Sequence, residues 1–131
     1  MNQEERQELV KYRIIKARET FNEVDLHVEN KFWNTTVNRL YYACYYAVIA
    51  LLIAKDIHAH THSGVRQMFG LHFVKSGLID KETGKFYSDI FDMRQTGDYD
   101  DYIDFKKEDV LDLIGPVNEL ISKIEGLLFK E

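Results

Sequence analysis

A chain of 131 residues with 45% apolar and 30% charged side chains has the length and composition of one globular domain, and we expect residues 1–131 to form it. The net charge of −5 is uneven, because residues 1–75 carry 10 basic and 8 acidic side chains whereas residues 76–131 carry 7 basic and 14 acidic ones. This distribution argues against the broad basic face that duplex DNA or a long RNA would need.

The N-terminal segment MNQEERQELV is too polar for a signal peptide, so we expect a cytoplasmic protein. The longest apolar run, Leu40–Ala54, is 15 residues long, fewer than the roughly 20 that cross a bilayer. We therefore expect no membrane association. The single cysteine, Cys44, lies inside this run, so it excludes an internal disulfide and is expected in the core.

Helical periodicity begins near the N-terminus. Residues 3–28 place apolar side chains at alternating intervals of four and three, which predicts a first helix with one buried face. Residues 31–55 are apolar nearly all round, and such a helix is typical of the centre of a bundle.

A histidine-containing loop is expected at residues 56–63, DIHAHTHS. Ser63 is a candidate N-cap for a third helix, which should end near the stop signal Ser76-Gly77. In that helix His72 falls on the apolar face, and we expect it to be a buried, hydrogen-bonded core histidine.

Two more helices are predicted in the C-terminal half. One covers residues 81–96, and Gly97 is well placed to end it. The other covers 107–128 and contains Pro116, the one proline, which predicts either a kink or a break into two helices. The fold class is therefore an all-α bundle of four to five helices with the helix at 31–55 in its centre.

Cofactor motifs are absent from the sequence, including GxGxxG, the P-loop, GxSxG, HExxH and paired CxxC. His58, His60 and His62 alternate along the loop and could hold Zn²⁺ or Ni²⁺ from one side of an extended segment. No carboxylate or cysteine completes the ligand set, so we favour a metal-free loop and expect no cofactor.

Arg94 raises a separate question, because it shares the apolar side of its helix with Tyr87 and Ile90. A buried arginine costs stability unless it is paired. Asp98 could pair with it across the helix end and tie the following loop to the helix. The rival interpretation is an anion site in which Arg94 forks onto a phosphate.

The predicted central helix contains more polar side chains than are usual in a core helix. Buried hydroxyl and guanidinium groups require partners, so this helix should face a polar pocket or a second subunit, and we expect a homodimer. The residues concerned are Asn34, Asn38, Arg39, Tyr41, Tyr42, Tyr45 and Tyr46.

Three blocks, NRLYYACYYAVIALLIAKDI, THSGVRQMFGLHFVKSG and RQTGDYDDYIDF, resemble the HEPN domain family. The likeness is to its small stand-alone branch of uncharacterised bacterial and archaeal proteins, covers nearly the whole chain and is clearest over 36–105. The resemblance implies an all-α bundle that dimerises. Many HEPN proteins are RNases with an arginine followed by a histidine after four to six residues. Many are encoded beside a minimal nucleotidyltransferase as toxin and antitoxin, and others bind nucleotides or scaffold partners without catalysis.

Carried over residue by residue, the family arginine is Arg94, but the histidine position holds Tyr99. A histidine titrates near pH ~6.5 and a tyrosine near ~10, so Tyr99 is a poor base at neutral pH. His62 matches a loop histidine of this branch and could replace the missing base. The resemblance thus implies catalytic candidates Arg94, Tyr99 and His62, and binding candidates Arg39, Tyr42, Arg94 and Asp98.

These residues support two functions and a purely structural third. We favour an interaction module that pairs with a nucleotidyltransferase-type partner in a toxin–antitoxin-like pair and binds a nucleotide or phosphate at Arg94. The alternative is a metal-independent RNase toxin with R-x4-Y in place of R-x4-H. The third is a dimer with no ligand. In the first two, Arg94, Asp98 and Tyr99 should lie close to Arg39, Tyr42 and His62.

Overall fold

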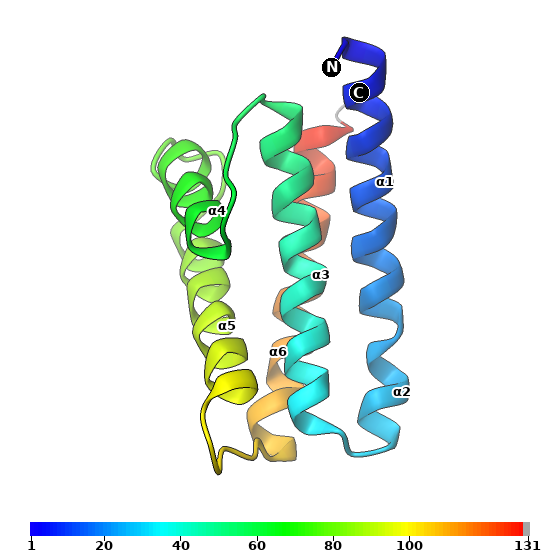
Figure 1. Cartoon of the computed structure of the whole chain (residues 1–131), viewed down its shortest axis with the longest axis vertical. Coiled ribbons are helices and arrows are strands. Elements are labelled where there is room, and N and C mark those ends of the chain that lie inside the picture. The colour runs from blue at the N-terminus through cyan, green and yellow to red at the C-terminus, as the bar shows by residue number, and fades with distance from the viewer. Residues whose placement is uncertain (130–131) are drawn as a thin grey trace.

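The computed structural model describes residues 1–129 and arranges them as a bundle of helices along one long axis, with both ends of the chain at the same end of the bundle (Figure 1). Its elements are α1 (Gln3–Asn22), α2 (Val24–Glu29), α3 (Trp33–Ala54), α4 (His62–Phe69), the π-helical turn η1 (Gly70–Val74), α5 (Lys81–Tyr99) and α6 (Lys107–Leu128). No strand occurs among these described residues, so the predicted all-α bundle is confirmed.

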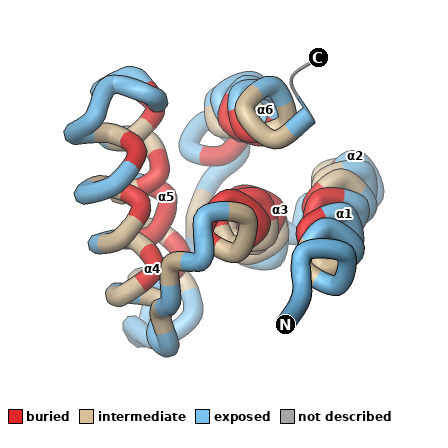
Figure 2. Tube along the Cα trace, turned by 90° about the horizontal axis from the view of Figure 1, so that it is seen from above, coloured by how far each residue is buried: buried red, intermediate tan, exposed pale blue. Residues whose placement is uncertain are grey.

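Helix α3 lies in the centre of the bundle, as its composition predicted. It contacts α1, α2, α4, α5 and α6, and Figure 2 shows its buried surface surrounded by the other helices. Leu40, Cys44, Ala47 and Leu51 have no exposed surface and form one side of the core. Burial raises the pKa of the Cys44 thiol well above its usual value, so this cysteine is an inert core residue.

The length of α3 exceeds that of the apolar run within it. By length and composition alone this 22-residue helix could cross a membrane, with a mean hydropathy of 1.4 over its most apolar window. Of that window, 56% is buried inside the bundle. Its position in the core of the bundle therefore explains the apolar composition of α3, since a buried core helix is apolar nearly all round.

The first predicted helix is interrupted at Glu23, where α1 ends and α2 begins. The predicted cap of the third helix was wrong by two residues. The Thr61 side chain, rather than Ser63, accepts a hydrogen bond from the backbone N–H of Gly64 at 2.9 Å and caps α4.

The expectation that His72 is a core residue was also wrong, because His72 is exposed. A regular α-helix would have kept the register of α4, but the turn Gly70–Val74 is π-helical, and the wider turn rotates the residues that follow. Phe73 consequently occupies the buried position.

Gly97 does not end its helix, because α5 continues to Tyr99. The role of Gly97 is to make room, since a Cβ there would lie 2.6 Å from Cε2 of Phe105. The break considered at Pro116 does not occur, and α6 runs unbroken from Lys107 to Leu128. Pro116 is exposed, so water can hydrate the carbonyl that loses its helical donor.

Candidate functional site

Arg94 lies on the buried side of α5, as predicted, and its side chain is 4% exposed. Its guanidinium carbon lies 4.7 Å from the centre of the Tyr41 ring, 5.5 Å from that of Tyr42 and 5.8 Å from that of Tyr99. A cation over aromatic faces is stabilised by the ring quadrupoles. The polar tyrosines of α3 thus hold a permanent cation that the core would otherwise exclude.

The hydrogen bonding of Arg94 is incomplete. Its Nη1 atom is 3.6 Å from Oδ2 of Asp98, longer than the 2.7–2.9 Å typical of charge-assisted bonds, and its buried Nε has no acceptor. Asp98 belongs to α5 itself, one turn after Arg94, rather than to the loop beyond the helix as expected. Arg94 is therefore a buried cation with capacity to bind another anion.

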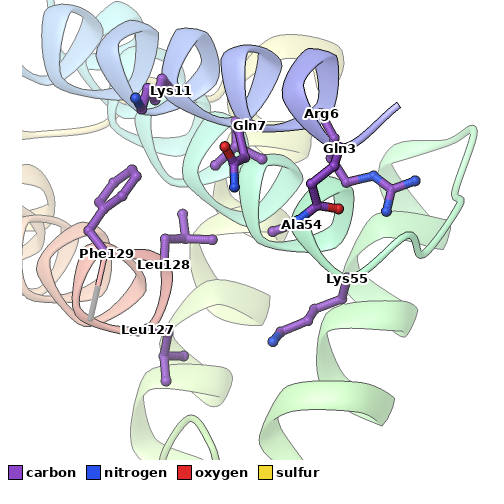
Figure 3. A pocket seen from close by; sticks show the side chains of 10 residues that line it. Gln3, Arg6, Gln7, Lys11, Ala54, Lys55, Leu127, Leu128 and Phe129 are labelled. Carbon is purple, nitrogen blue, oxygen red and sulfur yellow. The ribbon is translucent and has the colours of Figure 1, made fainter. Parts of the chain in front are cut away.

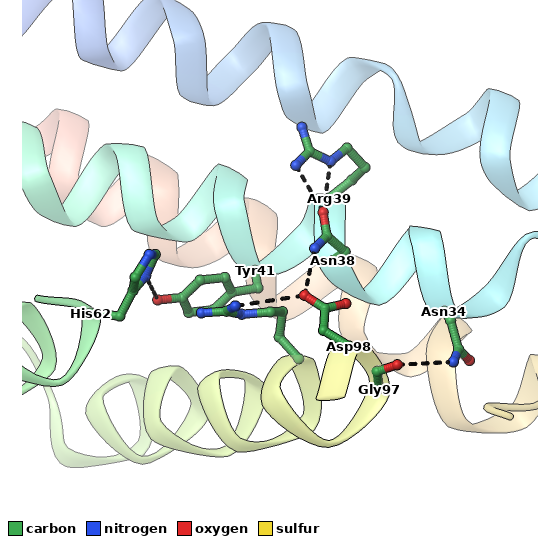
Figure 4. Close-up of polar contacts among 8 residues, drawn as sticks. Asn34, Asn38, Arg39, Tyr41, His62, Gly97 and Asp98 are labelled. Atoms are coloured by element: carbon green, nitrogen blue, oxygen red, sulfur yellow. Dashed lines mark hydrogen bonds and ion pairs between the residues drawn. The ribbon is translucent and has the colours of Figure 1, made fainter. Parts of the chain in front are cut away.

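A chain of polar side chains joins Asp98 to Arg39 across α3 and α5 (Figure 4). Asn38 donates from Nδ2 to Oδ2 of Asp98 at 2.9 Å. Its Oδ1 accepts from Nε and Nη2 of Arg39 at 3.0 and 2.8 Å. The Arg39 guanidinium also lies 5.1 Å from the centre of the Tyr42 ring, so Tyr42 contacts both arginines.

Asn34, rather than the Arg94–Asp98 pair, ties the loop after α5 to the central helix. Its Nδ2 donates to the Ile103 carbonyl at 2.9 Å, and its Oδ1 accepts from the Phe105 backbone N–H at 2.8 Å. An amide side chain can donate and accept at once, which suits it to hold two backbone groups of one loop. This contact also keeps the Phe105 ring against Gly97.

His62, the first residue of α4, reaches the same site through Tyr41. The Tyr41 hydroxyl is 2.8 Å from Nδ1 of His62, and the Tyr45 ring stacks on the imidazole with centres 4.3 Å apart. Burial raises the pKa of Tyr41 to about 12. Burial and the charge of Arg94 lower the pKa of His62, so both groups are neutral at pH 7.

The other loop histidines lie elsewhere. His58 is exposed, with Nε2 3.3 Å from Oδ1 of Asp56, and His60 is exposed as well. Within residues 1–129, no three His, Cys, Asp or Glu side chains are grouped closely enough to hold a metal ion.

The sequence singled out six site residues, and the structure brings all six together in one cluster that also contains Tyr41. Arg94, Asp98 and Tyr99 come from α5, Arg39 and Tyr42 from α3, and His62 from α4. Tyr41 was missed as the link between His62 and Arg94, and Asn38 as the link between the arginines. The signal for Tyr41 was a phenol at a core position, whose hydroxyl must find a partner.

Comparison with known proteins assigns the fold to a family. The HEPN domain model matches residues 10–127, a range that contains every residue of this site. The chain belongs to the HEPN family. A relative from Thermotoga maritima, named "UPF0332 protein", is 40% identical over 124 residues, which are 95% of this chain and 94% of that protein. A Methanocaldococcus jannaschii protein named "Putative toxin MJ0142" is 32% identical over 118 residues, covering 90% of this chain and 80% of the relative.

The surroundings of Arg94 in this HEPN protein differ from those that the R-x4-H pattern implies, because a tyrosine stands at the histidine position. Tyr99, at the histidine position, is 73% exposed and covers one side of the guanidinium. The imidazole comes instead from α4, hydrogen-bonded to a buried phenol. The site offers a cation, a neutral imidazole and several phenols, which are groups that bind phosphates and stack on bases.

Proposed function

We propose that this HEPN protein is an interaction module that binds a phosphate or nucleotide at Arg94 and pairs with a nucleotidyltransferase-type partner in a toxin–antitoxin-like system. The observation that carries the proposal is the buried guanidinium of Arg94 with a free Nε and one long ion pair. A cation held in this state gains two charge-assisted bonds when a phosphate arrives.

Entry of the anion requires little rearrangement. The Asp98 side chain is 27% exposed and already accepts a hydrogen bond from Asn38, so its carboxylate stays hydrated and hydrogen-bonded when it moves away from Arg94. Tyr99 is largely exposed and can turn away from the guanidinium, since few contacts hold an exposed ring. We infer that these moves would give a phosphate access to Arg94, where a bidentate contact would replace the 3.6 Å contact with the Asp98 carboxylate.

His62 decides between binding and cleavage. A phenol is a stronger donor than an imidazole N–H, and an imidazole nitrogen is the stronger acceptor, so the Tyr41 hydroxyl should donate to Nδ1. Nε2 then carries the proton and can donate to a phosphate oxygen. With this tautomer the neutral imidazole has no free lone pair for taking a proton from an RNA 2′-hydroxyl, which favours binding over hydrolysis.

The alternative function, a metal-independent RNase, has one observation in its favour. His62 has a lowered pKa, so the imidazole is neutral at pH 7, as a general base must be. If Nδ1–H donated to Tyr41 instead, Nε2 would be free to accept a proton while Arg94 steadied the phosphate. The direction of the Tyr41–His62 hydrogen bond therefore separates the two functions.

We also propose a homodimer built on the face of α3 that the other helices leave partly uncovered. Tyr42, Tyr45, Tyr46 and Ile49 are half-buried there, and a second copy would complete their burial. The nucleotidyltransferase-type partner would then approach the other exposed feature, the acidic segment 98–104. That segment carries four aspartates and exposed Tyr99 and Tyr102, which suit a basic protein surface better than a long RNA.

The test combines two assays on the pure protein. Titration with AMP should give saturable binding that Arg94→Ala abolishes, while incubation with RNA should give no cleavage. Arg66→Ala is the matched control, because Arg66 also lies over an aromatic ring, 4.2 Å from the centre of Phe91, and also pairs with an aspartate. Cleavage of RNA that Arg94→Ala removes and Arg66→Ala preserves would establish the RNase instead.

A further inference from the structure

A cavity of about 380 Å³ lies at the end of the bundle where the chain begins, away from Arg94. It opens between the start of α1, the end of α3 and the end of α6, and Figure 3 shows the side chains that line it. Its volume is within the range of pockets that bind small molecules in proteins, ~300–1,000 Å³.

The lining of this cavity combines an apolar floor with a cationic rim. Val10 from α1, Leu127 and Leu128 from α6 and Phe129 directly after α6 supply the floor. Arg6, Lys11 and Lys55 supply the rim, together with two glutamine amides, and among residues 1–129 no carboxylate lines the cavity. In a chain with 22 acidic and 17 basic side chains, Lys11 and Lys55 are cations with no acidic partner among residues 1–129, and Arg6 has one, Asp56.

The cations of the rim are poorly neutralised. Within residues 1–129, Lys11 and Lys55 form no ion pair, and the buried Nε of Arg6 has no acceptor. Arg6 forms an ion pair with Asp56, whose Oδ1 lies 3.4 Å from Nη2 of Arg6 and also 3.3 Å from Nε2 of His58. The charges of Lys11 and Lys55, which lack acidic partners, make the potential at the opening positive, and an anion placed there is stabilised by it.

We propose that this cavity binds a small amphipathic anion, an unbranched carboxylate of about eight carbons in all. The carboxylate lies among Arg6, Lys11 and Lys55, and the chain covers Val10, Leu127, Leu128 and Phe129. Octanoate has ten non-hydrogen atoms, and at the ~30 Å³ that one water molecule takes up in the liquid they need about 300 Å³, less than the cavity provides. A ligand of this size should bind with a Kd of about 1 mM.

This site is independent of the proposed function, because it shares no residue with the cluster around Arg94. The ligand chemistry follows from two separate properties of the lining. A cation would be repelled by the rim, whereas a neutral chain would bury the same floor without the ionic contacts.

The test is a titration of the ¹⁵N-labelled full chain with sodium octanoate, followed by backbone amide spectra. The peaks of Gln7 and Ala54, which line the cavity, should shift saturably below about 10 mM. Octylamine should cause no shift of these peaks, and octanol a weaker one. Raising the salt concentration should weaken octanoate binding, because the rim is open to solvent.

Variants distinguish a built site from general hydrophobic binding. Lys55→Gln should raise the Kd for octanoate about fivefold, and Phe129→Ala should raise it as well. Lys75→Gln, an exposed lysine outside the cavity, should leave it unchanged. Both Lys55 and Phe129 are exposed, so neither variant endangers the fold. Equal binding of octylamine, an unchanged Kd in Lys55→Gln, or no saturation at Gln7 and Ala54 would overturn the proposal.

Discussion

Replacing Tyr41 by phenylalanine should raise the pKa of His62. The ring that lies under Arg94 and packs in the core is kept, and only the hydroxyl 2.8 Å from Nδ1 of His62 is removed. If that hydroxyl donates to Nδ1 and keeps this orientation, it stabilises the neutral imidazole, because protonation of Nδ1 then breaks the bond. Its loss therefore favours the protonated form.

The size of this shift follows from the hydrogen bond. A bond between neutral groups contributes about 0.5–1.5 kcal/mol, and one pKa unit corresponds to about 1.36 kcal/mol, so the pKa should rise by about 0.4–1.1 units. The pKa of wild-type His62 begins below its usual value because of burial and the charge of Arg94, and the substitution leaves both causes in place.

The assay is an NMR titration of the imidazole carbon-bound protons in wild type and Tyr41→Phe, with the His62 peak assigned by its disappearance in His62→Gln. Tyr45→Phe is the control, because it keeps the ring stacked 4.3 Å from the imidazole. It should leave the pKa of His62 within about 0.3 units. A pKa that falls in Tyr41→Phe would refute the reasoning, since it would mean that the Tyr41 oxygen accepts a hydrogen bond from Nδ1–H of the protonated imidazole rather than staying a donor to Nδ1.

Three further predictions concern stability, each checked by chemical denaturation. Arg94→Ala should destabilise the fold by about 2–3 kcal/mol, because the contacts with aromatic rings are lost while Asp98 stays partly exposed and keeps its hydrogen bond from Asn38. Arg94→Lys should destabilise it by less. No loss of stability in Arg94→Ala would show that the guanidinium is not packed. Gly97→Ala should destabilise the fold by about 1–2 kcal/mol, because its Cβ would meet the Phe105 ring. Gly126→Ala, whose Cβ would have nothing within 4 Å, should stabilise the fold by about 0.5 kcal/mol. Equal effects of the two substitutions would contradict the close packing of Gly97 against Phe105. The pKa of His62 is lower in the folded than in the unfolded chain, so below about pH 6.5 the unfolded chain binds a proton that the folded chain does not. The free energy of unfolding should therefore decrease as the pH falls from about 6.5 toward the folded pKa. If a His62→Gln variant showed the same pH dependence, His62 would not be its cause.

The bundle and its central helix could be predicted because their signals are local. Apolar spacing along residues 31–55 and an all-round apolar composition require burial on several sides, whatever the neighbours are. The details that failed depend on contacts from elsewhere. Gly97 resembles a helix stop until the Phe105 ring is placed against it, and His72 resembles a core residue until the π-helical turn changes the register.

The site was predicted unevenly for the same reason. A lone arginine on an apolar stripe shows that partners must exist, so Arg94 could be singled out and Asp98 named beside it. The sequence could not show that Tyr41, spaced like any core residue, turns its hydroxyl to an imidazole from α4. It also could not show that the loop after α5 is held by Asn34, 69 residues before Ile103, since side-chain direction is set by the packed helices.

The magnitude expected for Arg94→Ala depends on the surroundings of Asp98. A loss of about 3–5 kcal/mol follows if removal of one partner leaves a buried, unpaired carboxylate. Asp98 is 27% exposed and bonded to Asn38, so it stays solvated and paired after the substitution. The smaller value therefore reflects packing and cation–π contacts rather than a stranded charge.

The most direct test of the central claim is the Nε–Hε signal of Arg94 in NMR spectra during a titration with AMP. This group has no acceptor in the free protein, so a phosphate held by the guanidinium must change its environment. We predict that the Arg94 signal and the His62 ring signals shift together and saturate at one Kd, and that Arg94→Lys weakens the binding. If the Arg94 signal stays in place while AMP shifts other residues, or shifts none, Arg94 is not the anion site.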